Sequence, residues 1–158
     1  MTAPIVAVVA FVLMEPAAAG AHRLVMHGRG WSWHRSHHIG RHDRFERNDR
    51  FPALSACITV SAMSMGASTG VPWLVAAGAG VSGYGLAYLL VHDVCVHGRL
   101  THGQPALTGR WLRWVAASHA VHHRTGAAPY GFLCPVMRAR ALTEREGRSL
   151  ANTSRLGE

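Results

Sequence analysis

A stretch of forty residues, from position 52 to position 91, contains no Asp, Glu, Lys or Arg. One helical crossing of a bilayer requires about 20 consecutive apolar residues, so this stretch is long enough for two crossings. The sequence GASTGVP at 66–72 divides it, because Gly and Pro favour a turn. We therefore predict a helical hairpin whose membrane spans lie at about 53–69 and 73–91.

The first 21 residues carry a single charge, on Glu15, and predict a further span at about 3–21. A cleaved signal peptide is the alternative, but the segment lacks a positively charged beginning, and the residues that follow it are rich in His and Arg. A length of 158 residues fits one domain. We predict an all-α integral membrane protein with three to four transmembrane helices, a membrane domain at 1–137 and a basic, flexible C-terminal tail at 138–158.

The basic residues give the expected orientation. All sixteen are Arg, with seven between positions 23 and 50 and nine between 99 and 155, and none lies in the hairpin turn. The positive-inside rule then places the N-terminus outside and both Arg-rich groups on the cytoplasmic side of a bacterial inner membrane. We interpret the net charge of +8 as a signal for orientation and for binding to lipid headgroups. The long neutral hairpin argues against a nucleic-acid-binding module.

The chain contains twelve His, six after the first span and six after the third, so the predicted topology brings all of them to one face of the membrane. An HxxxxH pair followed by an HxxHH cluster occurs twice, within 22–42 and within 92–124. In a helix, positions i, i+3 and i+4 share one face, so each HxxHH cluster is expected to direct three imidazoles to one point. An i, i+5 pair shares a face less well, which suits the end of a span, and we expect the chain to turn at Gly28 and Gly98.

These spacings predict metal binding, because ten buried imidazoles without partners would cost about 1–3 kcal/mol each, whereas neutral imidazole is a ligand for Zn, Cu, Fe and Ni. Ten ligands are too many for one tetrahedral zinc and fit two metals with four or five His each. The sequence has no HExxH motif and no Glu-plus-ExxH pattern, and no Met-rich set accompanies the His as a copper site would suggest. The expected ligands are His22, His27, His34, His37, His38, His92, His97, His119, His122 and His123; His42 and His102 fall outside the pattern.

The paired His boxes with a hydrophobic hairpin between them resemble the membrane fatty-acid hydroxylase/sterol desaturase superfamily. The run Phe45-Glu46-Arg47-Asn48-Asp49 and the HD-x-x-VH form of residues 92–97 are similar to its carotenoid branch, the β-carotene 3-hydroxylases. The resemblance extends from about Met14 to Pro135. Val94-Cys95 departs from the Gly-Leu usual in that branch, but no His position departs from the pattern.

The resemblance implies hydroxylation at C3 of a β-ionone ring, from β-carotene to β-cryptoxanthin and then zeaxanthin, with ketolated rings toward astaxanthin as further substrates. It implies two non-haem iron ions, O2 as co-substrate and electrons from a ferredoxin system that draws on NAD(P)H. The chemistry agrees, because no side-chain acid, base or nucleophile attacks an unactivated ring methylene. We expect no catalytic residue beyond the metal centre, and Asp49, Asp93 and Glu15 are candidates to orient the imidazole N–H groups.

Two alternatives remain. The same site would serve a hydroxylase or desaturase of another membrane lipid, such as a fatty acid or a sterol. Outside enzymes, the chain would be a His-rich membrane protein that binds haem or transports a metal. A transporter places ionisable ligands near the middle of the membrane, where the hairpin has none, and haem would use only one or two of the ten His.

Overall fold

The computed structural model describes residues 2–39, 45–99 and 109–135. All regular secondary structure in these three segments is helical. The predictions that concern other positions lie outside the described residues: His42, His102 and the tail at 138–158.

Three long helices form the body of the molecule: α1 (Thr2–Ala21), α3 (Arg50–Ser68) and α4 (Pro72–Tyr88). A π-helix extends α1 (η1, His22–Arg29), and another extends α4 (η3, Leu89–Val96). With these extensions, three segments are long and apolar enough to cross a membrane: 2–29, 47–68 and 72–96. The prediction of an all-α chain with three to four spanning helices is confirmed, with three candidate spans in the part of the chain that the structure describes. The first and third segments run further than predicted, because the π-helices carry them past Ala21 and Val91.

Helix α4 lies between the other two long helices and packs against both of them. A close approach of α1 to α4 depends on Gly80, because a Cβ atom there would overlap the backbone oxygen of Ala7 and lie 2.9 Å from the Cβ of Ala10. Small residues at such a contact let two helix backbones approach closely in lipid, where packing rather than hydrophobic burial holds helices together. This contact fixes α1 relative to α4 and hence the two π-helices that follow them.

We expect Gly80→Ala to destabilise the bundle by about 1–3 kcal/mol, the usual range for an overpacked contact, because the backbone of α1 has to move. Gly83→Ala is the matched control on the same helix. Its new Cβ would meet only the ring of Phe11 at 3.6 Å, an ordinary contact, and Ala is favoured over Gly in a helix interior by about 0.5–1 kcal/mol. Thermal unfolding of the purified chain in detergent should move the two midpoints in opposite directions; equal midpoints would contradict the close approach.

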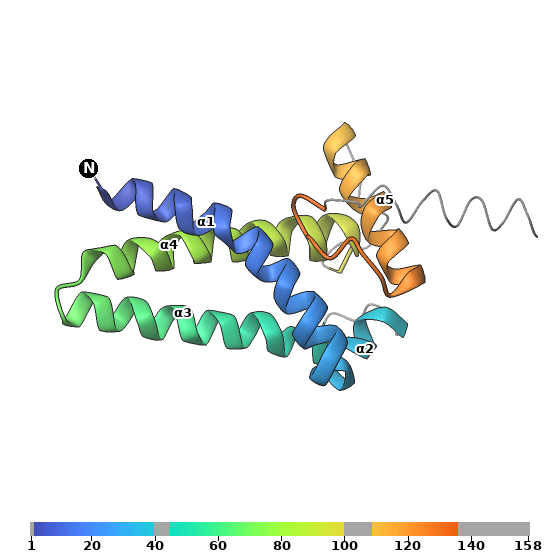
Figure 1. The fold of residues 1–158 in the computed structure, drawn as a ribbon, viewed down its shortest axis with the longest axis horizontal. Helices are drawn as coiled ribbons and strands as arrows, with labels where there is room; N and C mark the ends of the chain where they lie inside the picture. The colour runs from blue at the N-terminus through green and yellow to red at the C-terminus, as the bar shows by residue number, and fades with distance from the viewer. Residues whose placement is uncertain (1, 40–44, 100–108, 136–158) are drawn as a thin grey trace, which may run out of the picture.

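The remaining elements gather at one end of the bundle, opposite the N-terminus and the α3–α4 turn (Figure 1). They are α2 (Trp31–Ile39), the 3-10 turn η2 (Arg47–Asp49) and α5 (Arg110–Thr125). Gly126, in the left-handed conformation with φ 63°, ends α5, as is common after a helix. Both His-rich stretches of the sequence therefore meet at one end of the molecule.

Candidate metal centre

The two HxxxxH pairs lie where the membrane helices change into π-helices. A π-helix closes i to i+5 hydrogen bonds, and one such bond joins the His97 amide to the His92 carbonyl at 3.0 Å. This winding brings residues five apart onto one side, so the ring centroids of His22 and His27 are 5.1 Å apart and those of His92 and His97 are 4.6 Å apart. The expectation that these pairs share a face poorly was wrong, because it assumed α-helical winding.

The chain turns after each pair, as predicted. Gly28 has non-helical backbone angles, φ −100° and ψ −119°, at the end of η1. Gly98 has φ 65°, in the left-handed region that glycine tolerates best. The turns direct the chain away from the membrane helices.

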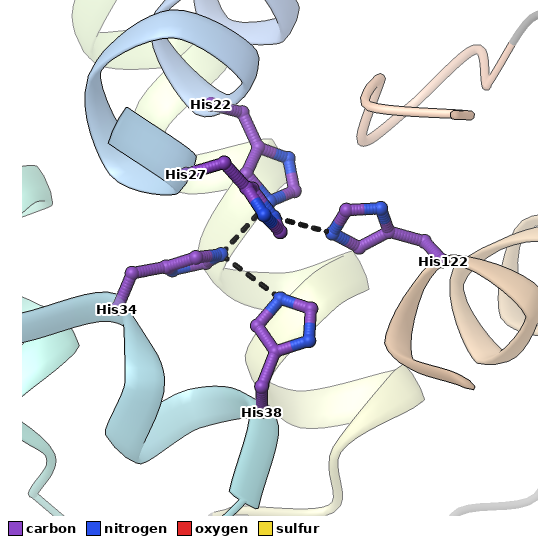
Figure 2. A group of neighbouring side chains, drawn as sticks. All are labelled: His22, His27, His34, His38 and His122. Atoms are coloured by element: carbon purple, nitrogen blue, oxygen red, sulfur yellow. Dashed lines mark hydrogen bonds between the residues drawn. The ribbon is translucent and has the colours of Figure 1, made fainter. Parts of the chain in front are cut away.

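Nine of the ten patterned His fall into two groups, and within each group the candidate ligand atoms all lie within 4.8 Å of one another. The five-histidine group, shown in Figure 2, consists of His22, His27, His34, His38 and His122. The four-histidine group consists of His37, His92, His97 and His119. Each group draws on both halves of the chain.

The three His of each HxxHH cluster do not all point to the same group. The expectation that each cluster directs three imidazoles to one point was therefore wrong. On α2, His34 and His38 join the five-histidine group while His37 joins the other. On α5, His119 belongs to the four-histidine group and His122 to the five-histidine group. The reason is that positions i+3 and i+4 lie on either side of residue i, about 100° apart around the helix axis. Each helix therefore passes between the two groups and contributes to both.

His123 completes this pattern without belonging to either set of close ligand atoms. Its ring centroid lies 4.4 Å from that of His119 and 4.7 Å from that of His37. It also stacks on His38 of the five-histidine group, at 4.4 Å. Its ring therefore lies at the boundary between the two groups.

The hydrogen bonds of the imidazoles show which nitrogen atoms are available to a metal. In the five-histidine group, Nδ1 of His22 donates to the Tyr130 carbonyl (2.9 Å), and Nδ1 of His122 donates to the Ala127 carbonyl (2.7 Å). Nδ1 of His34 donates to Oδ1 of Asn48 at 2.7 Å. A neutral imidazole with its proton on Nδ1 presents a lone pair on Nε2. These bonds thus fix the tautomer that ligates a metal through Nε2.

The free lone pairs then face one another. Nε2 of His22 and Nε2 of His34 are 3.0 Å apart, and with both protons on Nδ1 no hydrogen bond joins them. Two lone pairs at this distance repel unless a cation lies between them. In the four-histidine group, Nε2 of His92 is buried and has no hydrogen-bond partner among the described residues, which is unusual for a buried polar atom. The donor set therefore fits metal cations in both groups.

Burial keeps these imidazoles neutral. Burial lowers the pKa of His34 to about 4. It lowers the pKa of His38 to about 3, where the nearby His123 adds to the effect. It also lowers the pKa of His122 to about 4. Neutral imidazole is the form that binds a metal.

We expect the metal-free chain to lose stability as the pH falls below about 6.5, the pKa of His in an unfolded chain. The unfolded state then binds more protons than the folded state, so unfolding becomes more favourable down to the folded pKa of His34 and His122, about 4. Thermal midpoints in detergent at pH 7.5 and pH 5 test this. The variant His38→Asn should show a shallower dependence, and a midpoint that does not change with pH would contradict buried neutral rings.

The carboxylates expected to orient the imidazoles lie in three different positions. Oδ1 of Asp93 accepts from Nδ1 of His92 at 2.7 Å. Asp49 forms no hydrogen bond to an imidazole among the described residues; it accepts from the Glu46 amide (2.9 Å) and from the Arg99 guanidinium. Glu15 lies further away and accepts from the backbone of residues 132–134. Of these three carboxylates, Asp93 is the one that hydrogen-bonds to a His in the described part of the chain.

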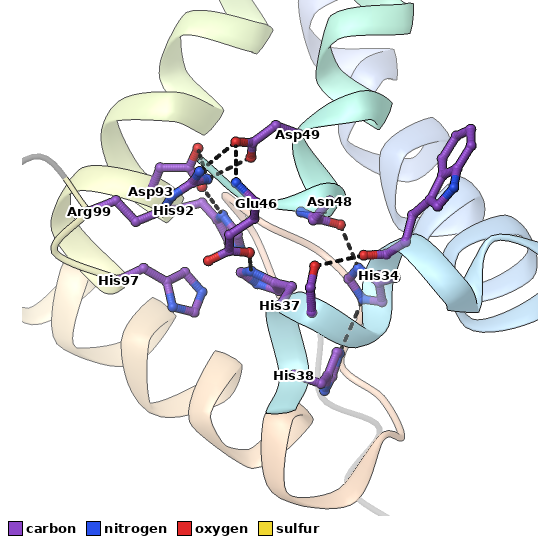
Figure 3. A network of polar contacts seen from close by, with 12 residues as sticks. His34, His37, His38, Glu46, Asn48, Asp49, His92, Asp93, His97 and Arg99 are labelled. Carbon is purple, nitrogen blue, oxygen red and sulfur yellow. Dashed lines mark hydrogen bonds and ion pairs between the residues drawn. The ribbon is translucent and has the colours of Figure 1, made fainter. Parts of the chain in front are cut away.

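Sequence reasoning missed several orienting groups, some of which Figure 3 shows. Glu46 accepts from Nδ1 of His37 at 3.1 Å, and Asn48 accepts from His34. Both belong to the Phe45–Asp49 run, so the run itself was the available signal, although only Asp49 was assigned a role. The carbonyls of Ala127 and Tyr130 carry no sequence signal, because every residue has one.

The chain is similar to one protein family and to several curated proteins. The family model described as fatty acid hydroxylase matches residues 7–139. The "Beta-carotene hydroxylase" of Pseudescherichia vulneris is 36% identical over 151 residues, covering 91% of this chain and 85% of the relative. That of Pantoea ananas is 39% identical, covering 85% and 79%.

The plant relatives are longer. The "Beta-carotene 3-hydroxylase 1, chloroplastic" of Arabidopsis thaliana is 41% identical over 132 residues, which are 80% of this chain and 42% of the relative. No solved structure matches the chain significantly. With its three spanning segments and its match to the family model over most of its length, the chain is an integral membrane protein that belongs to the fatty acid hydroxylase family.

Proposed function

We propose that this protein hydroxylates C3 of carotenoid β-ionone rings, taking β-carotene to β-cryptoxanthin and then zeaxanthin, and that it also accepts ketolated rings. The names of the bacterial and plant relatives support the substrate class. The observation that carries the chemistry is the pair of His groups whose Nε2 lone pairs converge in the interior. The reaction inserts one oxygen atom of O2 into a C–H bond. The other oxygen atom takes up two electrons and two protons and is released as water.

The two groups hold two non-haem iron ions in this proposal. The five-histidine group binds one, and the four-histidine group with His123 binds the other. The internal repeat supports the assignment of His123 to the four-histidine group. His123 corresponds to His38 in the first half of the chain, and it lies beside His119 as His38 lies beside His34. Iron bound in these groups supplies the activation of O2 that cleavage of an unactivated C–H bond needs.

The protein's own groups orient the rings and keep water from the site. The ring of Phe132 stacks on His22 at 4.9 Å, and that of Tyr88 stacks on His92 at 4.6 Å. His22, His34, His37 and His122 are each at most 2% exposed. Exclusion of water protects a reactive site from side reactions.

The substrate reaches this end of the bundle from the bilayer, into which a long polyene partitions. We place the N-terminus outside and the His groups on the cytoplasmic side. There a ferredoxin, which receives its electrons from NAD(P)H, delivers them to the site. The distribution of charge supports this orientation: exposed arginines lie on the segments around the site, including Arg29, Arg35, Arg110 and Arg113, and positive charge favours the cytoplasmic side. The membrane domain is residues 1–137.

Expression in a bacterium that accumulates β-carotene, with pigments separated by chromatography, tests the proposal. Mono- and dihydroxylated rings are the expected products, and a host that makes a ketolated carotenoid tests the second substrate. Unchanged β-carotene beside a folded, iron-loaded chain would overturn the carotenoid assignment in favour of another membrane lipid. Metal analysis that finds a single ion per chain would overturn the two-iron centre.

A further inference from the structure

Two acidic side chains that orient the four-histidine group belong to a network around one arginine. Asp93 accepts from His92, and Glu46 accepts from His37. Arg99 donates from Nη1 to Oδ2 of Asp93 at 3.1 Å. The same guanidinium forms a two-pronged bond to Asp49, with Nη1 to Oδ1 at 2.8 Å and Nη2 to Oδ2 at 2.6 Å (Figure 3).

The network continues from Asp49 to Glu46, which orients His37. Oδ2 of Asp49 accepts from the Glu46 amide at 2.9 Å and so holds Glu46, the N-cap residue of the short η2 turn. One guanidinium thereby links η3, which carries His92, to the N-cap of η2, where Glu46 orients His37. The two segments are far apart in the sequence, and both of these His belong to the four-histidine group.

The backbone places Arg99 for this role. The left-handed turn at Gly98 brings the Arg99 amide back to the Asp93 carbonyl at 2.9 Å. The side chain is 5% exposed, and Asp93 is 8% exposed. A charged side chain this deeply buried requires charged partners. The planar guanidinium can donate two parallel hydrogen bonds to one carboxylate, whereas a lysine ammonium lacks this geometry.

The five-histidine group is oriented differently. Three of its five rings donate from Nδ1 to neutral acceptors: His34 to the side chain of Asn48, His122 to the Ala127 carbonyl and His22 to the Tyr130 carbonyl. In the four-histidine group, by contrast, carboxylates accept from His92 and His37. A change in the charge network should affect the two groups unequally.

We propose that Arg99 is a positioning residue for the four-histidine group, holding Asp93 and Glu46 where they orient His92 and His37 for a metal. This inference rests on the proposed function, because it assumes a metal in each group. Loss of an outer partner of a metal ligand typically weakens metal binding about 10- to 100-fold. Arg99→Gln should therefore weaken binding of Fe2+ to this group by about that factor and leave the five-histidine group loaded.

The test is anaerobic titration of the purified, metal-stripped full chain in detergent with Fe2+, followed by metal analysis and Mössbauer spectroscopy. Wild type should bind about two ions per chain, and Arg99→Gln should keep about one tightly bound ion. Arg99→Lys, which retains the charge but not the two-pronged bond, should fall between them. Arg113→Gln on α5, which removes an exposed arginine, is the control and should match wild type.

Double variants separate positioning from general loss of structure. Arg99→Gln with His119→Ala should retain the single ion of either variant, because both affect the same group. Arg99→Gln with His22→Ala should bind none tightly. If wild type itself does not bind two ions, the proposed function fails; if wild type binds two and Arg99→Gln binds them as tightly or loses both together, the role of Arg99 is overturned.

Discussion

We expect the substitutions His119→Ala and His122→Ala each to reduce hydroxylated carotenoid to the background of the β-carotene-producing host, a loss of at least about 100-fold. Even outer partners of metal ligands are worth about 10- to 100-fold, and these residues are candidate ligands themselves. The two His are three positions apart on α5 but belong to different groups. Activity alone therefore does not distinguish the variants, because the proposed reaction needs both groups.

Metal content does distinguish them. Each variant should retain about one iron per chain, and the double variant none, because each substitution empties a different group. Mössbauer spectra of the two single variants should differ, since carboxylates orient two rings of the four-histidine group and neutral oxygens orient three rings of the five-histidine group. His102→Ala, a chemically matched change outside the repeated pattern, should keep both ions and full activity. Loss of both ions from either single variant would contradict two separate groups.

The spans and the meeting of both His-rich stretches could be predicted because they depend on local properties. Hydropathy and charge along the chain define the three spans, and the same spans place the residues after the first and third at one end of the bundle. The assignment of each His to a group could not be predicted in this way. It depends on how α2 and α5 lie relative to η1 and η3, which is a matter of tertiary packing.

The π-helical winding was also hidden from the sequence. With the α-helical period of 3.6 residues, the two His of an HxxxxH pair are expected on different faces of the helix. No residue pattern in the Ala21–Arg29 segment predicts the wider π-helical turn. The winding places a His at the membrane end of a helix and another five positions later in the same His group. π-Helical segments are frequent at functional sites for such reasons.

The substitution Glu15→Ala is expected to disturb the five-histidine group from a distance. Oε1 of Glu15 accepts from the amides of Phe132 and Cys134, both at 2.9 Å, and Oε2 accepts from that of Leu133 at 3.0 Å. The Tyr84 hydroxyl also donates to Oε2, at 2.7 Å. One carboxylate on α1 thus holds the loop after α5 against the membrane helices.

This loop carries groups that orient a candidate ligand. The Tyr130 carbonyl accepts from Nδ1 of His22, and the ring of Phe132 stacks on the same imidazole. Without the carboxylate, several donors lose their acceptor, at about 1–3 kcal/mol for each one that stays buried. We expect the loop to leave its position, His22 to lose its fixed tautomer, and the five-histidine group to lose its metal while the four-histidine group keeps one.

Two further variants make the test specific. Tyr84→Phe removes one donor and leaves the three amide bonds, so it should cost about 1 kcal/mol and keep both metals. Gly131→Ala should reproduce the effect of Glu15→Ala, because its Cβ would lie 2.6 Å from Oε1 of Glu15 and 3.1 Å from the Cys134 carbonyl. The measurements are metal content and hydrogen exchange of the amides at 132–134, which should speed up in Glu15→Ala and Gly131→Ala. Unchanged exchange with both metals retained would mean that the loop holds its place by other contacts, and that Glu15 has no part in orienting His22.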